Sequence, residues 1–283
     1  MQDIGSPPPL GAAALLRRHG IHPRRSRGQN FLDDPEALHR IVAAAHLSRS
    51  DTVLEIGGGL GSLTRQLARA AGTVVTIEVD DALYEILREV LDGYSNVQAI
   101  HGDILSTDLS ALGLPRGYVV AANIPYYITS PILRHLLESL PRPSCIVLTV
   151  QAEVAERLCA KPPGMSVLGV SVQIHGTAKV MEKIQAGCFY PKPQVDSAVV
   201  RVDCFAEPLV DAAQRSQFFR VVKAGFLQPR KTLRNSLAAG LGLPVTQTVS
   251  LLKQAGIDPT RRAETVDVEE WIRLTVAAST AGA

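Results

Sequence analysis

A glycine-rich turn directly after an apolar segment constrains the fold of this chain more than any other feature. Residues 52–56 read Thr-Val-Leu-Glu-Ile, and residues 57–61 read Gly-Gly-Gly-Leu-Gly. The apolar segment has the length and the branched side chains of a buried strand, and the glycines let the backbone turn sharply and approach a ligand closely. Residues 62–70 continue with the spacing of a helix, so the turn lies at a helix N-terminus. The segment therefore predicts the first strand, turn and helix of an α/β sheet.

The same alternation of strand and helix patterns continues along the chain. We predict strands at 73–78, 97–103, 118–122, 145–150, 170–175, 178–184 and 197–202, and helices at 34–45, 81–90, 131–140 and 152–159. Such alternation is typical of a parallel sheet with helices on both faces. After Pro208 the apolar spacing changes to three and four residues, which indicates a separate helical domain. We therefore predict a mobile arm at 1–20, an α/β domain at 21–208 and a helical domain at 209–283.

The bulk composition excludes several classes of protein. Hydrophobic residues make up 46% and charged residues 20% of the 283 positions, as in ordinary globular proteins. No apolar run approaches the roughly 18 residues that a membrane span requires, so we expect no membrane association. The four cysteines lack Cys-x-x-Cys spacing, which argues against a zinc site or a disulfide framework. We expect a cytoplasmic protein without a bound metal.

The charges of the chain are strongly segregated. Residues 1–32 contain five Arg and one Asp, whereas residues 33–211 contain 14 Lys and Arg against 21 Asp and Glu. Residues 212–257 contain seven Lys or Arg and no acidic residue. Two basic ends around an acidic middle indicate a polyanionic partner, contacted by residues such as Arg24, Arg25 and Arg27 at the N-terminal end. The alternative is a solvated helix face together with a basic N-terminal segment.

Polar residues follow three successive predicted strands. Glu78 ends the second strand, Asp103 the third, and Asn123 follows the fourth. Ligands of open α/β sheets bind at the carboxyl ends of the strands, so these side chains should share one crevice. A carboxylate at Glu78 can hold the hydroxyls of a ribose, and one at Asp103 can accept from an adenine amino group. Each acid alone could instead be a helix cap.

The turn itself distinguishes between two adenosine cofactors. The dinucleotide fingerprint Gly-x-Gly-x-x-Gly has its third glycine where this chain has Ser62, so a nicotinamide cofactor fits poorly. S-adenosylmethionine fits better, because it brings no phosphate to be bound.

The segment Asn-Ile-Pro-Tyr at residues 123–126 predicts chemistry on an amino group of a nucleobase. Such an amine is a weak nucleophile because its lone pair is delocalised into the ring. The amide oxygen of Asn123 and the carbonyl of Ile124 could accept its two N–H groups and localise that lone pair. Pro125 would stiffen the loop and has no N–H to compete for the acceptors, and Tyr126 would stack on the base. The alternative is a strand-to-turn junction with a helix-starting proline.

Four segments together carry a resemblance to a known family. Residues 28–32 read Gly-Gln-Asn-Phe-Leu, 123–131 read Asn-Ile-Pro-Tyr-Tyr-Ile-Thr-Ser-Pro, 189–197 read Phe-Tyr-Pro-Lys-Pro-Gln-Val-Asp-Ser, and 225–237 read Gly-Phe-Leu-Gln-Pro-Arg-Lys-Thr-Leu-Arg-Asn-Ser-Leu. In this order they resemble the rRNA adenine N6,N6-dimethyltransferases of the bacterial KsgA (RsmA) type, from residue 28 to about residue 240. The resemblance implies a Rossmann-like S-adenosylmethionine-dependent methyltransferase sheet with a smaller C-terminal all-helical domain.

The resemblance also implies an activity and a partner. It implies dimethylation of N6 of two adjacent adenosines in the 3′-terminal hairpin of 16S rRNA, with release of S-adenosylhomocysteine. The partner would be the small ribosomal subunit, the chain would act as a monomer, and a role in subunit biogenesis would accompany catalysis.

The resemblance assigns roles residue by residue. The implied catalytic residues, with Phe189 facing Tyr126 across the target base, are Asn123, Pro125, Tyr126 and Phe189. The implied cofactor-binding residues are Asn30, Leu32, Gly57, Gly59, Glu78, Asp103 and Asn123. The implied RNA-binding residues are Arg220, Lys223, Arg230, Lys231 and Arg234.

The chain departs from the family pattern at three places. Gly58 stands where the family often has proline, which we expect to loosen the turn without removing the site. Pro229 replaces one Arg of the usual Arg-Arg-Lys, which would weaken one phosphate contact. Residues 1–20 have no clear counterpart.

Several other functions remain compatible with parts of the pattern. An Erm-type methylase of large-subunit rRNA shares the chemistry, but the segments at 195–197 and 225–237 favour the small-subunit enzyme. A DNA adenine methylase would require a larger target-recognition domain. A non-catalytic RNA-binding assembly factor would not require Glu78, Asp103 and Asn123, and a nicotinamide dehydrogenase would require a catalytic dyad that the sequence does not suggest.

Overall fold

The computed structural model describes residues 7–24 and 28–280, apart from the side chain of Tyr126. The chain forms two compact units. The first comprises residues 1–155 and 178–204, and the second comprises residues 156–177 and 205–283.

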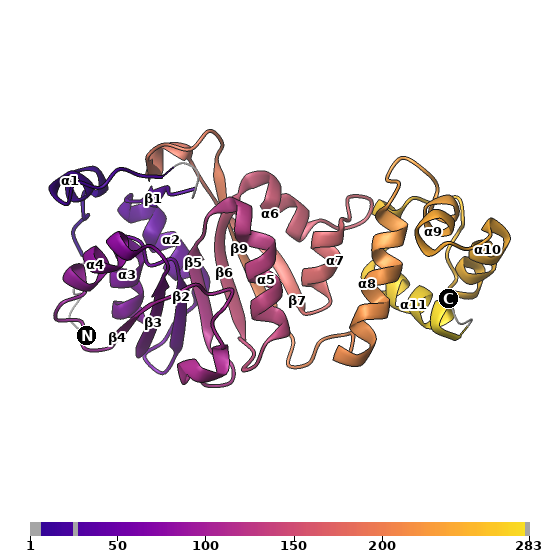
Figure 1. Ribbon diagram of the computed structural model, residues 1–283, viewed down its shortest axis with the longest axis horizontal. Coiled ribbons are helices and arrows are strands. Elements are labelled where there is room, and N and C mark those ends of the chain that lie inside the picture. The colour runs from indigo at the N-terminus through magenta and orange to yellow at the C-terminus, as the bar shows by residue number, and fades with distance from the viewer. Residues whose placement is uncertain (1–6, 25–27, 281–283) are drawn as a thin grey trace. The chain divides into compact units, whose positions relative to one another are not determined.

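A seven-stranded sheet forms the centre of the first unit (Figure 1). In spatial order its strands are β4 (Val97–His101), β3 (Thr73–Glu78), β2 (Thr52–Ile56), β5 (Val119–Asn123), β6 (Cys145–Gln151), β9 (Ser197–Cys204) and β7 (Gly176–Ile184). The strands from β4 to β6 are parallel, and β9 runs antiparallel to β6. The predicted parallel α/β sheet is therefore confirmed. Because β2 has β3 on one side and β5 on the other, the chain order reverses at β2, where open α/β sheets bind their ligands.

Helices α2 (Pro35–Ala45) and α3 (Ser62–Ala70) pack against one face of this sheet. Their residues Ile41 and Leu67 join Val53, Val119 and Val147 in one buried cluster. Val119 and Ala121 in this cluster are two residues apart on β5, as expected for side chains on the same face of a strand. The remaining elements of the unit include α4 (Asp81–Val90), η2 (Leu109–Leu112), η3 (Tyr126–Ile128), α5 (Thr129–Glu138) and η4 (Ala186–Cys188), and α6 (Ala152–Cys159) continues from it into the second unit.

The prediction of a mobile arm at 1–20 is wrong for residues 7–20, and residues 1–6 lie outside the described part of the chain. Helix α1 (Ala12–Arg18) buries Ala12 and Leu16 in a cluster with Leu60 and Ile86. The backbone N–H of Ala12 donates to the Asp33 carboxylate over 2.7 Å. The apolar side of this short helix is recognised only from its packing against residues elsewhere in the chain. The sequence pattern of the segment alone therefore did not predict the helix.

The second unit is helical. It contains α7 (Val167–Gln173), α8 (Ala212–Phe226), α9 (Leu233–Leu241), α10 (Val245–Gln254), η5 (Ala263–Thr265) and α11 (Val268–Thr280). Trp271 is fully buried at its centre beside Gly225, where an added Cβ would lie 2.3 Å from the indole ring. Within the described residues, no helix of either unit is long and apolar enough to cross a membrane.

The strand predicted at 170–175 is wrong, because residues 167–173 form helix α7. The Ser166 hydroxyl accepts the Gly169 N–H over 3.0 Å and caps this helix. Val170 and Ile174 lie four residues apart and pack into the core of the helical unit. Residues 156–177 accordingly belong with the helical unit. The prediction of a single domain boundary near residue 208 had placed them in the α/β domain.

Candidate active site

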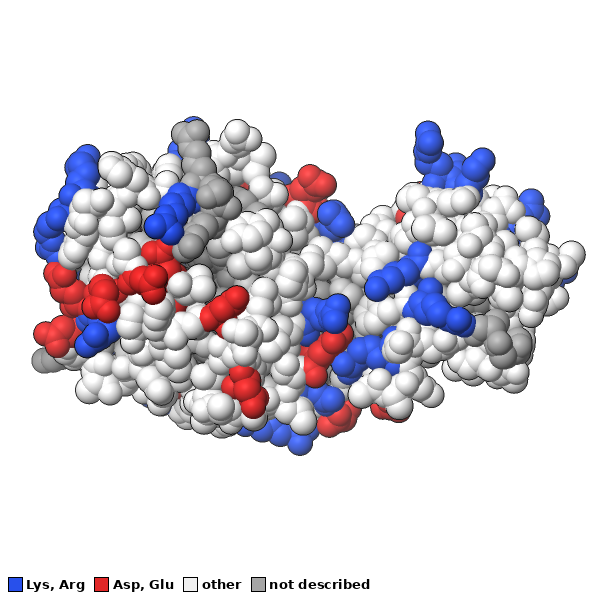
Figure 2. All heavy atoms as spheres, viewed as in Figure 1, with Lys and Arg blue, Asp and Glu red and all other residues white. Residues whose placement is uncertain are grey.

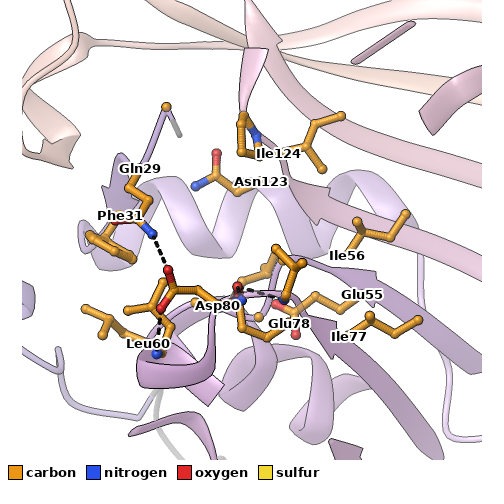
Figure 3. A pocket seen from close by; sticks show the side chains of 18 of the residues that line it. Gln29, Phe31, Glu55, Ile56, Leu60, Ile77, Glu78, Asp80, Asn123 and Ile124 are labelled. Atoms are coloured by element: carbon orange, nitrogen blue, oxygen red, sulfur yellow. Dashed lines mark hydrogen bonds between the residues drawn. The ribbon is translucent and has the colours of Figure 1, made fainter. Parts of the chain in front are cut away.

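A cleft opens at the carboxyl ends of β2, β3 and β5 in the first unit (Figure 3). In this view Asn123 and Ile124 lie on one side of the cleft, and Glu78 and Asp80 lie on the other. Most of the catalytic and cofactor-binding residues predicted from the sequence line this one cleft. They are Asn30, Leu32, Gly57, Gly59, Glu78, Asp103, Asn123 and Pro125.

The carboxylate of Glu78 is held by backbone donors. Its Oε2 accepts the Gly59 N–H over 2.8 Å, and its Oε1 accepts the N–H groups of Val79 and Asp80 over 3.0 and 2.9 Å. Burial raises the pKa of Glu78, and these backbone hydrogen bonds oppose the rise. A carboxylate has about four acceptor positions, so three backbone bonds leave capacity for a ligand hydroxyl. The side chain is thus fixed before any ligand arrives.

The glycine turn requires glycine for two different reasons. Gly57 and Gly59 have φ values of 74° and 55°, in the left-handed region that suits glycine. Gly58 has no such φ, but an added Cβ would lie 2.5 Å from Thr76 Oγ1 and 2.7 Å from Leu87 Cδ2. We had expected Gly58 to loosen the turn; in this structure a side chain at this position would require the side chains of Thr76 and Leu87 to shift.

Asp103 lies at the rim of the cleft, in an exposed position. Its Oδ1 accepts the Leu105 N–H over 2.9 Å. Two apolar residues of the cleft wall, Val79 and Ile104, follow Glu78 and Asp103 in the chain. This part of the cleft therefore offers carboxylate acceptors beside apolar side chains, as an adenosine requires.

A hydrogen bond fixes the amide of Asn123. Its Nδ2 donates to the main-chain carbonyl of Asn30 over 3.2 Å, and the Asn30 side chain donates to the carbonyl of Gly28 over the same distance. Because a carbonyl can only accept, the Asn123 atom facing Asn30 must be the NH₂ group. The Asn123 Oδ1 is then the hydrogen-bond acceptor of this side chain.

Among the predicted catalytic residues whose side chains are described, Phe189 does not line the cleft. Phe189 belongs to β8 (Phe189–Tyr190), which pairs with β1 (Phe31–Leu32), and it is only 5% exposed. It packs with Leu32 in the core cluster of the sheet, so it offers no open face to a base unless the β1–β8 ribbon shifts. The side chain of Tyr126 lies outside the described part of the structure. The base-stacking roles of Phe189 and Tyr126 stay predictions.

The sequence reasoning missed two acidic residues of the cleft. Glu55 is 1% exposed within β2, and burial raises its pKa to about 7 although the Thr64 hydroxyl donates to it over 2.6 Å. Asp80 caps helix α4 through the N–H groups of Ala82 and Leu83. A charged residue inside an apolar strand was the available signal for Glu55.

Asp80 also ties the N-terminal segment to the cleft. Its Oδ2 lies 3.4 Å from the Arg24 guanidinium and accepts from Gln29 Nε2 over the same distance. Arg25 and Arg27, which we predicted to contact RNA, lie outside the described residues. Of Arg24, Arg25 and Arg27, the structure therefore describes only Arg24, which lies beside Asp80.

The predicted RNA-binding residues lie in the helical unit. Arg220, Lys223, Arg230 and Lys231 are exposed, and Arg234 is half-buried. In the described part of the chain, none of these five side chains forms an ion pair within 4.0 Å. On the face of the helical unit shown in Figure 2, Lys and Arg predominate over Asp and Glu. Among the described residues, no group of three or more His, Cys, Asp or Glu is arranged to hold a metal ion.

Comparisons with known proteins identify relatives of the whole chain. The family model for ribosomal RNA adenine dimethylase matches residues 21–278. A "Ribosomal RNA small subunit methyltransferase A" of Dehalococcoides mccartyi (strain CBDB1) is 42% identical, over 96% of this chain and 94% of the relative. A protein of the same name from Moorella thermoacetica (strain ATCC 39073 / JCM 9320) is 45% identical, over 92% of this chain and 94% of the relative.

Two solved structures resemble the chain over most of its length. The 23S rRNA methyltransferase ErmE has a TM-score of 0.70 and 31% identity, covering 88% of this chain and 100% of that chain. A dimethyladenosine transferase from Plasmodium falciparum has a TM-score of 0.76 and 26% identity, covering 89% of this chain and 98% of that chain. These similarities confirm the predicted Rossmann-like methyltransferase fold.

Proposed function

The chain belongs to the ribosomal RNA adenine dimethylase family, and from this membership we propose its substrate and cofactor. It transfers methyl groups from S-adenosylmethionine to N6 of two adjacent adenosines in the 3′-terminal hairpin of small-subunit rRNA. The two relatives described above that are named for the small subunit are 42% and 45% identical to this chain, whereas the 23S rRNA enzyme ErmE is 31% identical. The identities therefore favour the small subunit over the large one.

The residues of the cleft suit S-adenosylmethionine. Glu78 would accept a hydrogen bond from a ribose hydroxyl, and Asp103 would accept one from the adenine amino group. The turn at Gly57 and Gly59 would approach the ligand closely. The apolar side chains of Val79 and Ile104 would contact the adenine ring. When bound, the cofactor supplies an electrophilic methyl group on a sulfonium.

The observation that carries the proposed activity is the fixed amide of Asn123. Asn30 holds the NH₂ end, so Oδ1 is available to accept a hydrogen bond from an N–H of the adenine amine. With the Ile124 carbonyl accepting the second N–H, the lone pair of the amine is directed away from the ring. An uncharged amide is sufficient here, because transfer from a sulfonium needs positioning and exclusion of water more than a strong base.

The basic face of the helical unit would bind the RNA. Its exposed Arg and Lys side chains lack acidic partners within 4.0 Å among the described residues, so they are available to phosphates. We propose that the protein acts in the cytoplasm as a monomer on the assembled or assembling small subunit.

The test is methylation of small ribosomal subunits that lack these modifications. The wild-type protein and labelled S-adenosylmethionine are incubated with such subunits, and the modified bases are mapped. We expect N6,N6-dimethyladenosine at two adjacent positions near the 3′ end of the small-subunit rRNA. Labelling of large-subunit rRNA alone, or of no RNA, would overturn the proposed function.

A further inference from the structure

Tyr127 lines the cleft and yet is 64% exposed. Other apolar side chains of the cleft, such as Ile124 and Leu60, are 2% exposed. A single exposed aromatic residue is common on protein surfaces, so exposure alone decides nothing. Tyr127 lies at the rim of the cleft, directly after Asn123 to Tyr126, so its exposed ring is placed to contact a substrate that enters the cleft.

The ring of Tyr127 is supported from one side. Gly28 approaches it so closely that an added Cβ would lie 3.6 Å from the ring atoms Cδ1 and Cε1, and 3.2 Å from Pro125 Cβ. The Ile128 N–H donates to the Pro125 carbonyl over 3.2 Å and closes the turn that carries the ring. Helix α5 begins directly afterwards at Thr129, which is 2% exposed. The ring is therefore held on a well-supported loop while most of its surface faces solvent.

The loop rises from the interior of the cleft to its rim. Ile124 is buried and Asn123 is half-buried, whereas Tyr127 is exposed. A base whose amine reaches Asn123 must leave the RNA stack and enter the cleft, and its neighbours in the strand then remain at the rim. Residues 123–133 contain no charged side chain, so an uncharged aromatic surface meets the RNA at this point. Such a surface suits a base better than a phosphate, because every base has a face that stacks on an aromatic ring.

We propose that Tyr127 is the stacking platform for the nucleotide that neighbours the target adenosine in the RNA. This inference rests on the proposed methylation of rRNA adenosines and adds a second nucleotide subsite to the cleft. The ring acts by holding the RNA while the adjacent base occupies the interior of the cleft. It makes no contact with the cofactor.

The test combines two variants with three RNA substrates. Small subunits are reconstituted with rRNA that carries either the normal nucleotide or an abasic one directly 5′ or directly 3′ of the target adenosine. The wild type, Tyr127→Leu and the matched control Tyr127→Phe are compared for KM, kcat and the Kd of S-adenosylmethionine. Stacking on an aromatic ring predicts that Tyr127→Leu raises KM for normal subunits about 5- to 100-fold, and that Tyr127→Phe stays within twofold of wild type.

The abasic substrates identify the partner of the ring. At one of the two positions, the abasic nucleotide should raise the KM of the wild type as much as Tyr127→Leu raises the KM for normal subunits. At that position, Tyr127→Leu should show no further increase in KM with the abasic RNA. The Kd of S-adenosylmethionine should be equal in all three proteins, which also shows that the variants are folded. Three results would each overturn the inference. They are KM increases of Tyr127→Leu and of the abasic nucleotide that add fully at both positions, an unchanged KM in Tyr127→Leu, and a loss of S-adenosylmethionine affinity in Tyr127→Leu as large as its increase in KM. If the wild type methylates no adenosine in normal subunits, the proposed function itself fails, which is a distinct result.

Discussion

The two sides of the cleft differ in how many hydrogen bonds the protein itself makes to their polar side chains. On one side, the buried carboxylate of Glu78 accepts three backbone N–H groups from Gly59, Val79 and Asp80. On the other side, the half-buried amide of Asn123 has one hydrogen bond among the described residues, from Nδ2 to the Asn30 carbonyl. Under the proposed function, the first arrangement is a cofactor site that is formed before RNA binds. The second fixes an orientation but leaves the acceptor open, so the target side is completed by the substrate.

This difference predicts the largest effect for the amide. Asn123→Ala should lower kcat about 10²- to 10³-fold, because it removes an acceptor that matters most in the transition state. The Kd of S-adenosylmethionine should change less than threefold. Steady-state kinetics with under-methylated small subunits and cofactor titration provide the two measurements. A neutral substitution would mean that the loop is structural.

The opposite pattern is expected on the cofactor side. Glu78→Ala removes charge-assisted hydrogen bonds to the ligand, so it should weaken cofactor binding by about 1.5–3 kcal/mol. The KM for small subunits should stay close to that of the wild type when the cofactor is saturating. Cofactor affinity within twofold of wild type would contradict the assignment of Glu78.

The buried acid beneath the cleft predicts a pH effect on stability. Burial raises the pKa of Glu55 to about 7, above the value of 4.5 for the free side chain. The folded state therefore holds this proton more tightly than the unfolded state, and the associated stability is lost as the pH rises from about 4.5 through 7. Between pH 5 and 8, the ionisation of Glu55 should lower the free energy of unfolding of the wild type by about 2 kcal/mol. Glu55→Gln cannot ionise at this position, so the variant should lack this decrease. Parallel pH profiles for wild type and variant, from urea titrations, would show that Glu55 does not titrate in this range.

The smallest expected effect concerns the helical unit. Arg230→Ala combined with Lys231→Ala should reduce the slope of log affinity for the small subunit against log salt concentration by about one to two units. Methylation of bound adenosines should be preserved at low salt, because these side chains position the RNA without reading its sequence. The Arg88→Ala variant is a suitable control, since Arg88 lies outside both basic ends of the chain and pairs with Glu85 on the first unit. An unchanged slope in the double variant would assign Arg230 and Lys231 to solvation alone.

The elements around the cleft could be predicted well from the sequence, because local patterns determine them. The strand at Thr52–Ile56 and the helix at Ser62–Ala70 have the predicted bounds, since an apolar run and a glycine turn define both. Helix α7 was missed because Val167, Val170 and Val172 favour a strand locally, while packing in the helical core decides the outcome.

The site was less predictable than the fold where tertiary packing decides. The sequence placed Glu78 and Asn123 at strand ends, but not the backbone bonds that fix them. The burial of Phe189 in the core and the raised pKa of Glu55 follow from neighbours distant in the sequence. The hydrogen bond from Asn123 to Asn30 joins residues that are 93 positions apart, so no local pattern could show it.

The most direct test of the division between the two sides is a titration of S-adenosylmethionine into the RNA-free protein. Calorimetry would compare the wild type with Glu78→Ala and Asn123→Ala under identical conditions. The account predicts that the wild type binds the cofactor without RNA, that Asn123→Ala binds it with nearly the same Kd, and that Glu78→Ala binds it about 10- to 100-fold more weakly. Equal weakening by both substitutions, or no binding to the wild type until RNA is added, would contradict a cofactor site that is formed in advance of the substrate.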